Sequence, residues 1–205
     1  MSMKLYYAPG TCAVACWIAL KWADAAFEAV KVDYASKEFK RINPLAAVPA
    51  LDIGTGRAMT QADAILSYIA ETHPGAALGP DPDPLGRFEF GETMAFLTGD
   101  FHPAFWPFFF PARYTTDESQ QALDHVRAAA FARIDRAMAH LDALIGEDGH
   151  VYRHRHTVAD AYAFIMARWS AKTPKSWQDY PNISRLFALM ESDDAVREVL
   201  ERSQA

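Results

Sequence analysis

Two cysteines four residues apart, Cys12 and Cys16, are the residues whose type most directly suggests chemistry. Cys12 follows the turn sequence Pro9-Gly10 and precedes a segment with helical spacing of apolar residues, which predicts that it lies at a helix N-terminus. Unpaired amides and the helix dipole favour an anion there, so we expect the Cys12 thiol to ionise more readily than a free thiol. The alternative is a small buried core residue, which is the interpretation favoured for Cys16.

Two further candidates would present backbone groups to a ligand. Val48-Pro49 precedes a strand pattern, and a proline at the first position of a strand is either an edge residue or part of a cis turn. A cis bond would leave the Val48 N–H and C=O free to pair with an extended peptide. Gln61-Ala62 opens a helix pattern, where the free amides form a carboxylate site unless Thr60 or Asp63 caps the helix.

An aromatic segment follows His102 and offers either a hydrophobic pocket or part of the core. Its members that we assign to a substrate pocket are Phe105, Trp106 and Phe109. His102 itself is a candidate proton-transfer or hydrogen-bonding residue, or a plain helix residue, since histidine reactivity depends on neighbours that a sequence does not show.

Three histidines, His150, His154 and His156, lie close together in a segment that also contains arginines. The segment lacks the paired-cysteine or Glu-x-x-His spacing typical of zinc sites. We therefore interpret it as a solvated basic turn and assign no metal.

Length and composition restrict the class of protein. The chain has 205 residues, 51% of them hydrophobic and 22% charged, which is typical of a folded globular protein. The net charge of −6 argues against a nucleic-acid partner, and no apolar run is long enough to span a membrane. The chain passes from Met1 almost directly into a strand pattern, so we expect no secretory leader and a cytoplasmic location.

The elements that position these candidates fall into two parts. Residues 1–78 alternate strand and helix patterns in the order βαβαββα, which predicts a small α/β domain. Residues 79–86 form a linker rich in proline and glycine. Residues 87–205 have helical patterns only, most clearly over 119–145, and Thr157-Val158-Ala159-Asp160 has the spacing of a capping box.

Four motifs together resemble the cytosolic glutathione transferases, and the cysteine after Pro-Gly is most like the bacterial beta class. The motifs cover nearly the whole chain, in the family's order: Met3-Lys4-Leu5-Tyr6-Tyr7-Ala8-Pro9-Gly10-Thr11-Cys12, Asn43-Pro44-Leu45-Ala46-Ala47-Val48-Pro49-Ala50-Leu51, Thr60-Gln61-Ala62-Asp63-Ala64-Ile65-Leu66 and Thr157-Val158-Ala159-Asp160-Ala161-Tyr162. The resemblance implies a thioredoxin-like N-terminal domain, a helical C-terminal bundle and a homodimer.

The resemblance also implies roles for single residues. Val48 and the cis-Pro49 would pair with the cysteinyl unit of glutathione, and Gln61 and the Ala62 amide would hold its γ-glutamyl end. Catalysis would rest on Cys12 and His102, which lie beside the glutathione sulfur. Asp100, two residues before that histidine, takes the place of a glutamate common in the beta class, and Tyr7 is a rival sulfur ligand at the end of the first strand.

The sequence also departs from the family pattern. Gln61-Ala62 stands where an acid and a small hydroxyl residue are common, Ala95 where an asparagine is common, and Pro103 where a lysine is usual.

Three functions remain open. The first is conjugation of the glutathione thiol to a hydrophobic electrophilic small molecule. The second is glutathione-dependent reduction of disulfides or peroxides through Cys12. The third is a non-catalytic binding protein on the same fold, which the departures at Gln61, Ala62, Ala95 and Pro103 would fit.

Overall fold

The computed structural model describes residues 3–204. Residues 1–2 of the predicted N-terminal domain and residue 205 of the predicted C-terminal domain lie outside the described residues. The N-terminal part contains a four-stranded sheet in the order β2-β1-β3-β4. Strand β1 (Met3–Tyr7) pairs in parallel with β2 (Phe27–Lys31) and antiparallel with β3 (Ala50–Asp52), which pairs antiparallel with β4 (Met59–Thr60). The observed element order matches the predicted βαβαββα.

The two faces of this sheet are covered by different helices. Side chains alternate along β1, so that Leu5 and Tyr7 are buried in the core that includes α1 (Ala13–Trp22) and α3 (Ala62–Thr72). Tyr6 points the other way and lies 6.1 Å, between ring centroids, from Phe39 of the short helix α2 (Lys37–Ile42). The sheet therefore supports the segments before α1 and α3, where the candidate residues lie.

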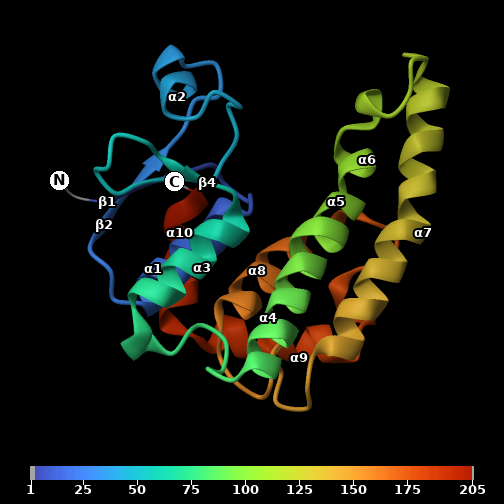
Figure 1. Ribbon diagram of the computed structural model, residues 1–205. Coiled ribbons are helices and arrows are strands. Elements are labelled where there is room, and N and C mark those ends of the chain that lie inside the picture. Colours follow the sequence, from blue (N-terminus) through green and yellow to red (C-terminus); the bar gives the residue numbers. More distant parts are fainter. Residues whose placement is uncertain (1–2, 205) are drawn as a thin grey trace.

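The remainder of the described chain is helical, as predicted (Figure 1). A single long helix, α7, lies within one residue of the predicted range at each end. The principal elements are α4 (Pro84–Phe96), the π-helical segment Leu97–Phe101, α5 (His102–Ala104), α6 (Trp106–Phe109), α7 (Gln120–Leu144), α8 (Val158–Ala167), α9 (Pro181–Ser192) and α10 (Asp194–Gln204). Short 3-10 helices occupy Pro74–Ala76, Pro111–Arg113, Arg168–Lys172 and Trp177–Asp179.

The predicted linker is shorter in the structure than in the sequence interpretation. Helix α4 begins at Pro84, and Asp83 caps it by accepting a hydrogen bond from the Gly86 amide at 2.8 Å. Residues 84–86 are thus helical, because proline is well suited to the first turn of a helix. The boundary itself stays a prediction.

Both α8 and the last helix, α10, pack against α1 (Figure 1). An ion pair joins Lys21 of α1 to Glu198 of α10 at 2.9 Å, and the Trp22 indole N–H donates to Asp193 at 3.1 Å. The C-terminal segment therefore returns to the N-terminal part, instead of contacting only the other helices. None of the helices in residues 3–204 is both long and apolar enough to cross a membrane.

One half of the predicted capping box forms at the start of α8: Asp160 reaches back to the Thr157 amide, whereas the buried Thr157 hydroxyl has no hydrogen-bond partner within residues 3–204. Asp160, completely buried, accepts hydrogen bonds from the Thr157 and Val151 amides, each at 2.8 Å. The same carboxylate lies 3.2 Å from Nδ1 of His150. Asp160 thus joins the first turn of α8 to the loop before it through hydrogen bonds.

The histidine loop is tied to the protein more closely than a solvated turn would be. His150 pairs with Asp160, and His154 lies 2.8 Å from the Asp148 carboxylate. The His156 ring packs edge-on against Trp22 with 3.8 Å between centroids.

Candidate active site

Cys12 lies directly before the first residue of α1, as the sequence predicts. Its thiol donates to the carbonyl oxygen of Val48, with an S···O distance of 3.5 Å. One turn later the thiol of Cys16, which is completely buried, lies 4.0 Å from the carbonyl oxygen of Ala62. One face of α1 therefore touches both backbone segments that we expect to hold glutathione.

The expected ready ionisation of the Cys12 thiol is wrong. The thiol is almost fully buried, and burial raises the pKa of Cys12 to about 12. The backbone amides of Cys12 and Ala13 lower this pKa, but by less than burial raises it. Cys12 is consequently a protonated thiol at neutral pH, as is Cys16, whose pKa burial also raises.

The peptide bond between Val48 and Pro49 is cis, so the alternative of an ordinary trans edge proline is excluded. Pro49 is buried and Val48 is half-buried. The Val48 carbonyl oxygen accepts a hydrogen bond from the Cys12 thiol. The Val48 N–H has no hydrogen-bond partner within residues 3–204. One of the two backbone groups expected to be free is therefore free.

Gln61 precedes α3 in an unusual backbone conformation, with φ +71° and ψ 120°. A non-glycine residue is strained at positive φ, and such strain is concentrated at functional sites. Within residues 3–204 no side chain caps this helix, so the capping alternative for Thr60 or Asp63 does not hold. The Gln61 side chain is exposed, and the Ala62 amide begins the free first turn, an arrangement that suits a carboxylate.

His102 follows the π-helical segment Leu97–Phe101, a local geometry that is often found at functional sites. Its Nδ1 atom lies 2.7 Å from the Tyr162 hydroxyl of α8. Burial lowers the pKa of His102 to about 4, so the imidazole is neutral at neutral pH.

Trp169 connects His102 to the turn that carries Cys12. Its indole N–H donates to the Gly10 carbonyl oxygen at 2.7 Å. The ring of Trp169 also packs edge-on against His102, with 5.0 Å between ring centroids. The structure therefore brings His102 to the Cys12 turn through a tryptophan that the sequence analysis did not single out.

Tyr162 is the second residue that the sequence analysis missed. It lies in α8 two residues after the capping box, for which we predicted only a helix start. The signal in the sequence was a tyrosine among the mostly apolar residues of α8, whose hydroxyl requires a partner when it is buried.

The other predicted site residues differ in their burial and in their neighbours. Phe105 is completely buried and belongs to the core, so it does not line an open pocket. Trp106 is 42% exposed beside His102, and Phe109 is half-buried beside Trp169. Tyr7 packs edge-on against Trp17 in the core, and no hydrogen bond within residues 3–204 joins it to Cys12.

Asp100 is exposed on the π-helical segment. No ion pair joins its carboxylate to another residue in the part of the chain that the structure describes. Its assignment to the glutathione site stays a prediction.

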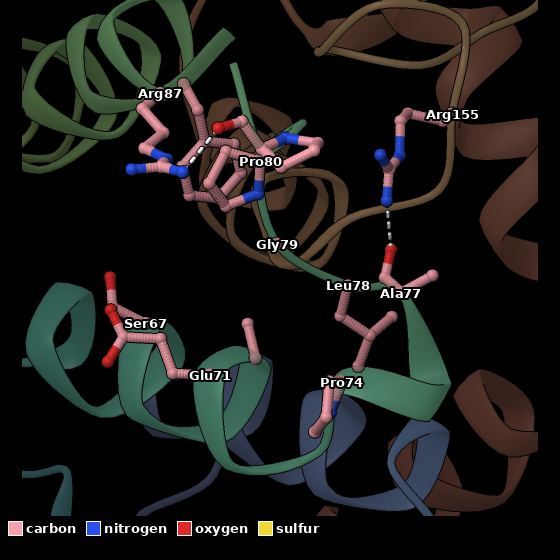
Figure 2. Close-up of a pocket in the computed structure, with 12 residues that line it drawn as sticks. Ser67, Glu71, Pro74, Ala77, Leu78, Gly79, Pro80, Arg87 and Arg155 are labelled. Carbon is pink, nitrogen blue, oxygen red and sulfur yellow. Dashed lines mark hydrogen bonds between the residues drawn. The ribbon is translucent and has the colours of Figure 1, made fainter. Parts of the chain in front are cut away.

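A cavity of about 590 Å³ lies at the junction of α3, the linker and α4 (Figure 2). Ser67 and Glu71 extend from α3 on one side, and Arg87 lies across the cavity, bound to the Pro82 carbonyl. Arg155 donates to the Ala77 carbonyl oxygen at 2.6 Å. None of the twelve lining residues is a predicted site residue, so this cavity is distinct from the candidate active site.

Acidification is expected to destabilise the wild-type protein more than the His102→Gln variant. The pKa of His102 is about 4 in the folded protein and 6.5 in an ordinary histidine. Between these two pH values the unfolded chain binds a proton on His102 that the folded protein does not bind. Stability therefore falls as the pH falls through this range, by about 2–3 kcal/mol for this residue. Urea unfolding of both proteins at neutral pH and near pH 4.5 measures the difference; equal losses would contradict the assignment.

Comparison with known proteins identifies the class. A family model of the glutathione S-transferase N-terminal domain matches residues 1–71. Glutathione S-transferase GST-4.5 of Xanthomonas campestris pv. campestris is 35% identical over 97% of this chain and 98% of its own length. GstA of Escherichia coli O157:H7 is 26% identical over 97% of each chain. The chain belongs to the glutathione S-transferase family of enzymes, with a thioredoxin-like N-terminal domain.

Solved structures narrow the resemblance within the family. A bacterial beta class glutathione S-transferase of Sphingomonas chungbukensis superposes with a TM-score of 0.85, 33% identity and 98% coverage of both chains. The glutathione S-transferase of Xylella fastidiosa superposes with a TM-score of 0.89, 30% identity and 98% coverage of both chains. A sphingomonad glutathione S-transferase complexed with glutathione has a TM-score of 0.85 and 32% sequence identity, again over 98% of each chain. The beta class is thus the part of the family that this chain resembles.

Proposed function

We propose that this protein conjugates the thiol of glutathione to hydrophobic electrophilic small molecules. One observation carries the proposal: the turn before α1 places Cys12 against Val48, whose N–H is free beside the cis-Pro49, while Cys16 on the same helix contacts Ala62. The backbone groups suited to an extended peptide and to a carboxylate therefore lie along one face of the same helix. A relative of 32% identity was solved in complex with glutathione, which supports the same ligand here.

In this proposal glutathione lies along the turn before β3. Its cysteinyl unit pairs with the Val48 backbone, and its γ-glutamyl carboxylate approaches the first turn of α3 at Gln61 and Ala62. Trp106 and Phe109 then offer a partly exposed aromatic surface, next to His102, for the electrophile. Holding the two reactants side by side is one source of rate acceleration in such a site.

The state of Cys12 favours conjugation over the reductase alternative. A mixed disulfide forms through a thiolate, and burial keeps Cys12 protonated at neutral pH. Conjugation requires only that the glutathione thiol ionise. We further propose a cytoplasmic location, because both cysteines are free and a reducing compartment keeps them so.

Calorimetric titration of glutathione into the reduced protein at neutral pH tests the proposal. Binding at millimolar affinity or tighter, together with conjugation of chlorodinitrobenzene, would support it. A flat titration would instead favour the third hypothesis, a binding protein on the same fold.

Replacing Cys12 by alanine is expected to leave conjugation within about tenfold of wild type and to remove whatever glutathione-dependent disulfide reduction the wild type has. The reason is that the thiol donates a weak hydrogen bond to Val48 and is not ionised. Rates with hydroxyethyl disulfide and with chlorodinitrobenzene measure the two activities. Cys16→Ala is the matched control for loss of a buried thiol from the same helix. Loss of both activities in Cys12→Ala alone would contradict this expectation and show that conjugation also requires the Cys12 thiol.

We also propose a homodimer that uses the exposed face of α4. Leu85 and Phe88 lie three residues apart on this helix and are 59% and 63% exposed, as expected for a surface that a second copy covers. The substitution Phe88→Glu is expected to shift a dimeric wild type to monomer, measured by light scattering on a sizing column. Tyr114→Glu, at a residue 46% exposed, is the control and should remain dimeric. A monomeric wild type would contradict the proposal.

A further inference from the structure

The hydrogen bond between Tyr162 and His102 determines which ring nitrogen of the histidine carries its hydrogen. Nδ1 and the hydroxyl oxygen are 2.7 Å apart. Tyr162 is 1% exposed, and its hydroxyl has no other hydrogen-bond partner within residues 3–204. If Nδ1 carried the hydrogen, the hydroxyl hydrogen would be buried without an acceptor, which is unfavourable. Both groups are satisfied only when Tyr162 donates to an unprotonated Nδ1.

The charge state of the pair agrees with this arrangement. Burial lowers the pKa of His102 to about 4, so the imidazole is neutral and carries a single hydrogen. Burial raises the pKa of Tyr162 well above its ordinary value, so the phenol retains its hydrogen. With Nδ1 acting as acceptor, the imidazole hydrogen must be on Nε2.

The position of the ring shows where this Nε2–H can act. Within the described residues no hydrogen bond joins Nε2 to a partner. Helix α8, which carries Tyr162, packs on α1, which Cys12 precedes. The ring of His102 packs edge-on against both Trp106 and Trp169, and the Trp169 indole N–H donates to the carbonyl oxygen of Gly10, two residues before Cys12. A neutral, unused hydrogen-bond donor is therefore separated from the turn that carries Cys12 by one tryptophan side chain.

We propose that Tyr162 is a positioning residue: by donating its hydroxyl hydrogen to Nδ1, it holds neutral His102 in the Nε2–H form, which donates a hydrogen bond to the sulfur of bound glutathione. The second half of this inference rests on the proposed function. His102 then stabilises the glutathione thiolate without gaining or losing a proton, and the thiol proton passes to a water molecule. His102 is accordingly a donor and not a general base.

The tautomer can be measured directly in the wild-type protein. A two-bond proton–nitrogen NMR spectrum of protein labelled with heavy nitrogen in histidine distinguishes the protonated ring nitrogen from the unprotonated one. The His102→Gln variant assigns the signals. We expect protonated Nε2 and unprotonated Nδ1 at neutral pH. Protonated Nδ1, or a charged ring, would overturn the inference without any tyrosine variant being needed.

The Tyr162→Phe variant tests the positioning role. It removes the hydroxyl and keeps the ring, so His102 is expected to populate both tautomers and to titrate at a higher pH, since the hydrogen bond to its neutral form is lost. We expect kcat/KM for conjugation to fall about tenfold, as for one hydrogen bond that serves the transition state. Tyr152→Phe is the matched control: it removes another buried hydroxyl, which donates to the Gly86 carbonyl oxygen at 3.0 Å. An unchanged His102 titration and tautomer in Tyr162→Phe would overturn the role.

The two proposals fail in different ways. A flat glutathione titration together with the Nε2–H tautomer would contradict the proposed function and, with it, the contact to sulfur, but not the Tyr162 pairing. Glutathione binding together with the Nδ1–H tautomer would contradict the role of Tyr162 alone.

Discussion

Replacement of Asp160 by alanine is expected to destabilise the protein by about 3–5 kcal/mol. The carboxylate is completely buried and accepts the Thr157 and Val151 amides, each at 2.8 Å. Its removal leaves two buried amides unpaired, and each costs about 1–3 kcal/mol. It also takes away the partner of His150. Urea unfolding at neutral pH measures the loss.

Two further variants separate this effect from a general effect of removing charge. Asp160→Asn keeps one acceptor oxygen of the same size, so we expect it to lose less stability than the alanine variant. Asp124→Ala removes an exposed carboxylate that pairs with Arg127 on the surface of α7, and surface pairs contribute less than about 1 kcal/mol. If Asp160→Ala and Asp124→Ala lost similar stability, Asp160 would have no special structural role.

The local elements were predictable because they depend on local signals. Turn residues at Pro9-Gly10, apolar spacing after Cys12 and the Thr-x-x-Asp motif each specify backbone geometry within a few residues. The position of Cys12 before α1 and the capping role of Asp160 followed from such signals. The cis bond before Pro49 did not: the residues left both isomers open, and only the family resemblance implied the cis form.

What the sequence did not predict depends on burial by segments distant in the chain. A helix N-terminus favours a thiolate at Cys12, but burial of the thiol has the larger effect and raises its pKa to about 12. Phe105 was one of several aromatic residues with the same local pattern, and only packing separates it, fully buried, from Trp106, which is 42% exposed. The roles of Tyr162 and Trp169 arise from contacts to residues 60 and 159 positions away.

Removal of the His102 side chain in His102→Ala is expected to reduce kcat/KM for conjugation about 100-fold, which is typical for loss of one preorganised donor at developing charge. His102→Gln is expected to retain part of the activity, because the glutamine amide can donate to the same sulfur. Rates with glutathione and chlorodinitrobenzene, measured on both variants at equal folded concentration, test this order.

The pH dependence then separates a hydrogen-bond donor from a base. Because the pKa of His102 is about 4, the imidazole stays neutral from about pH 5.5 to about pH 8, and the ratio of wild-type to His102→Ala rates is expected to be constant over that range. The ratio is taken from kcat/KM for glutathione, which reports ionisation of the free thiol; this ionisation is the same for both proteins and cancels. A general base with an ordinary histidine pKa would instead make the ratio fall steeply below about pH 6.5. If His102 is a neutral donor, the ratio of wild-type to His102→Ala rates does not change with pH over this range. A ratio that falls as the pH is lowered would assign proton transfer to His102.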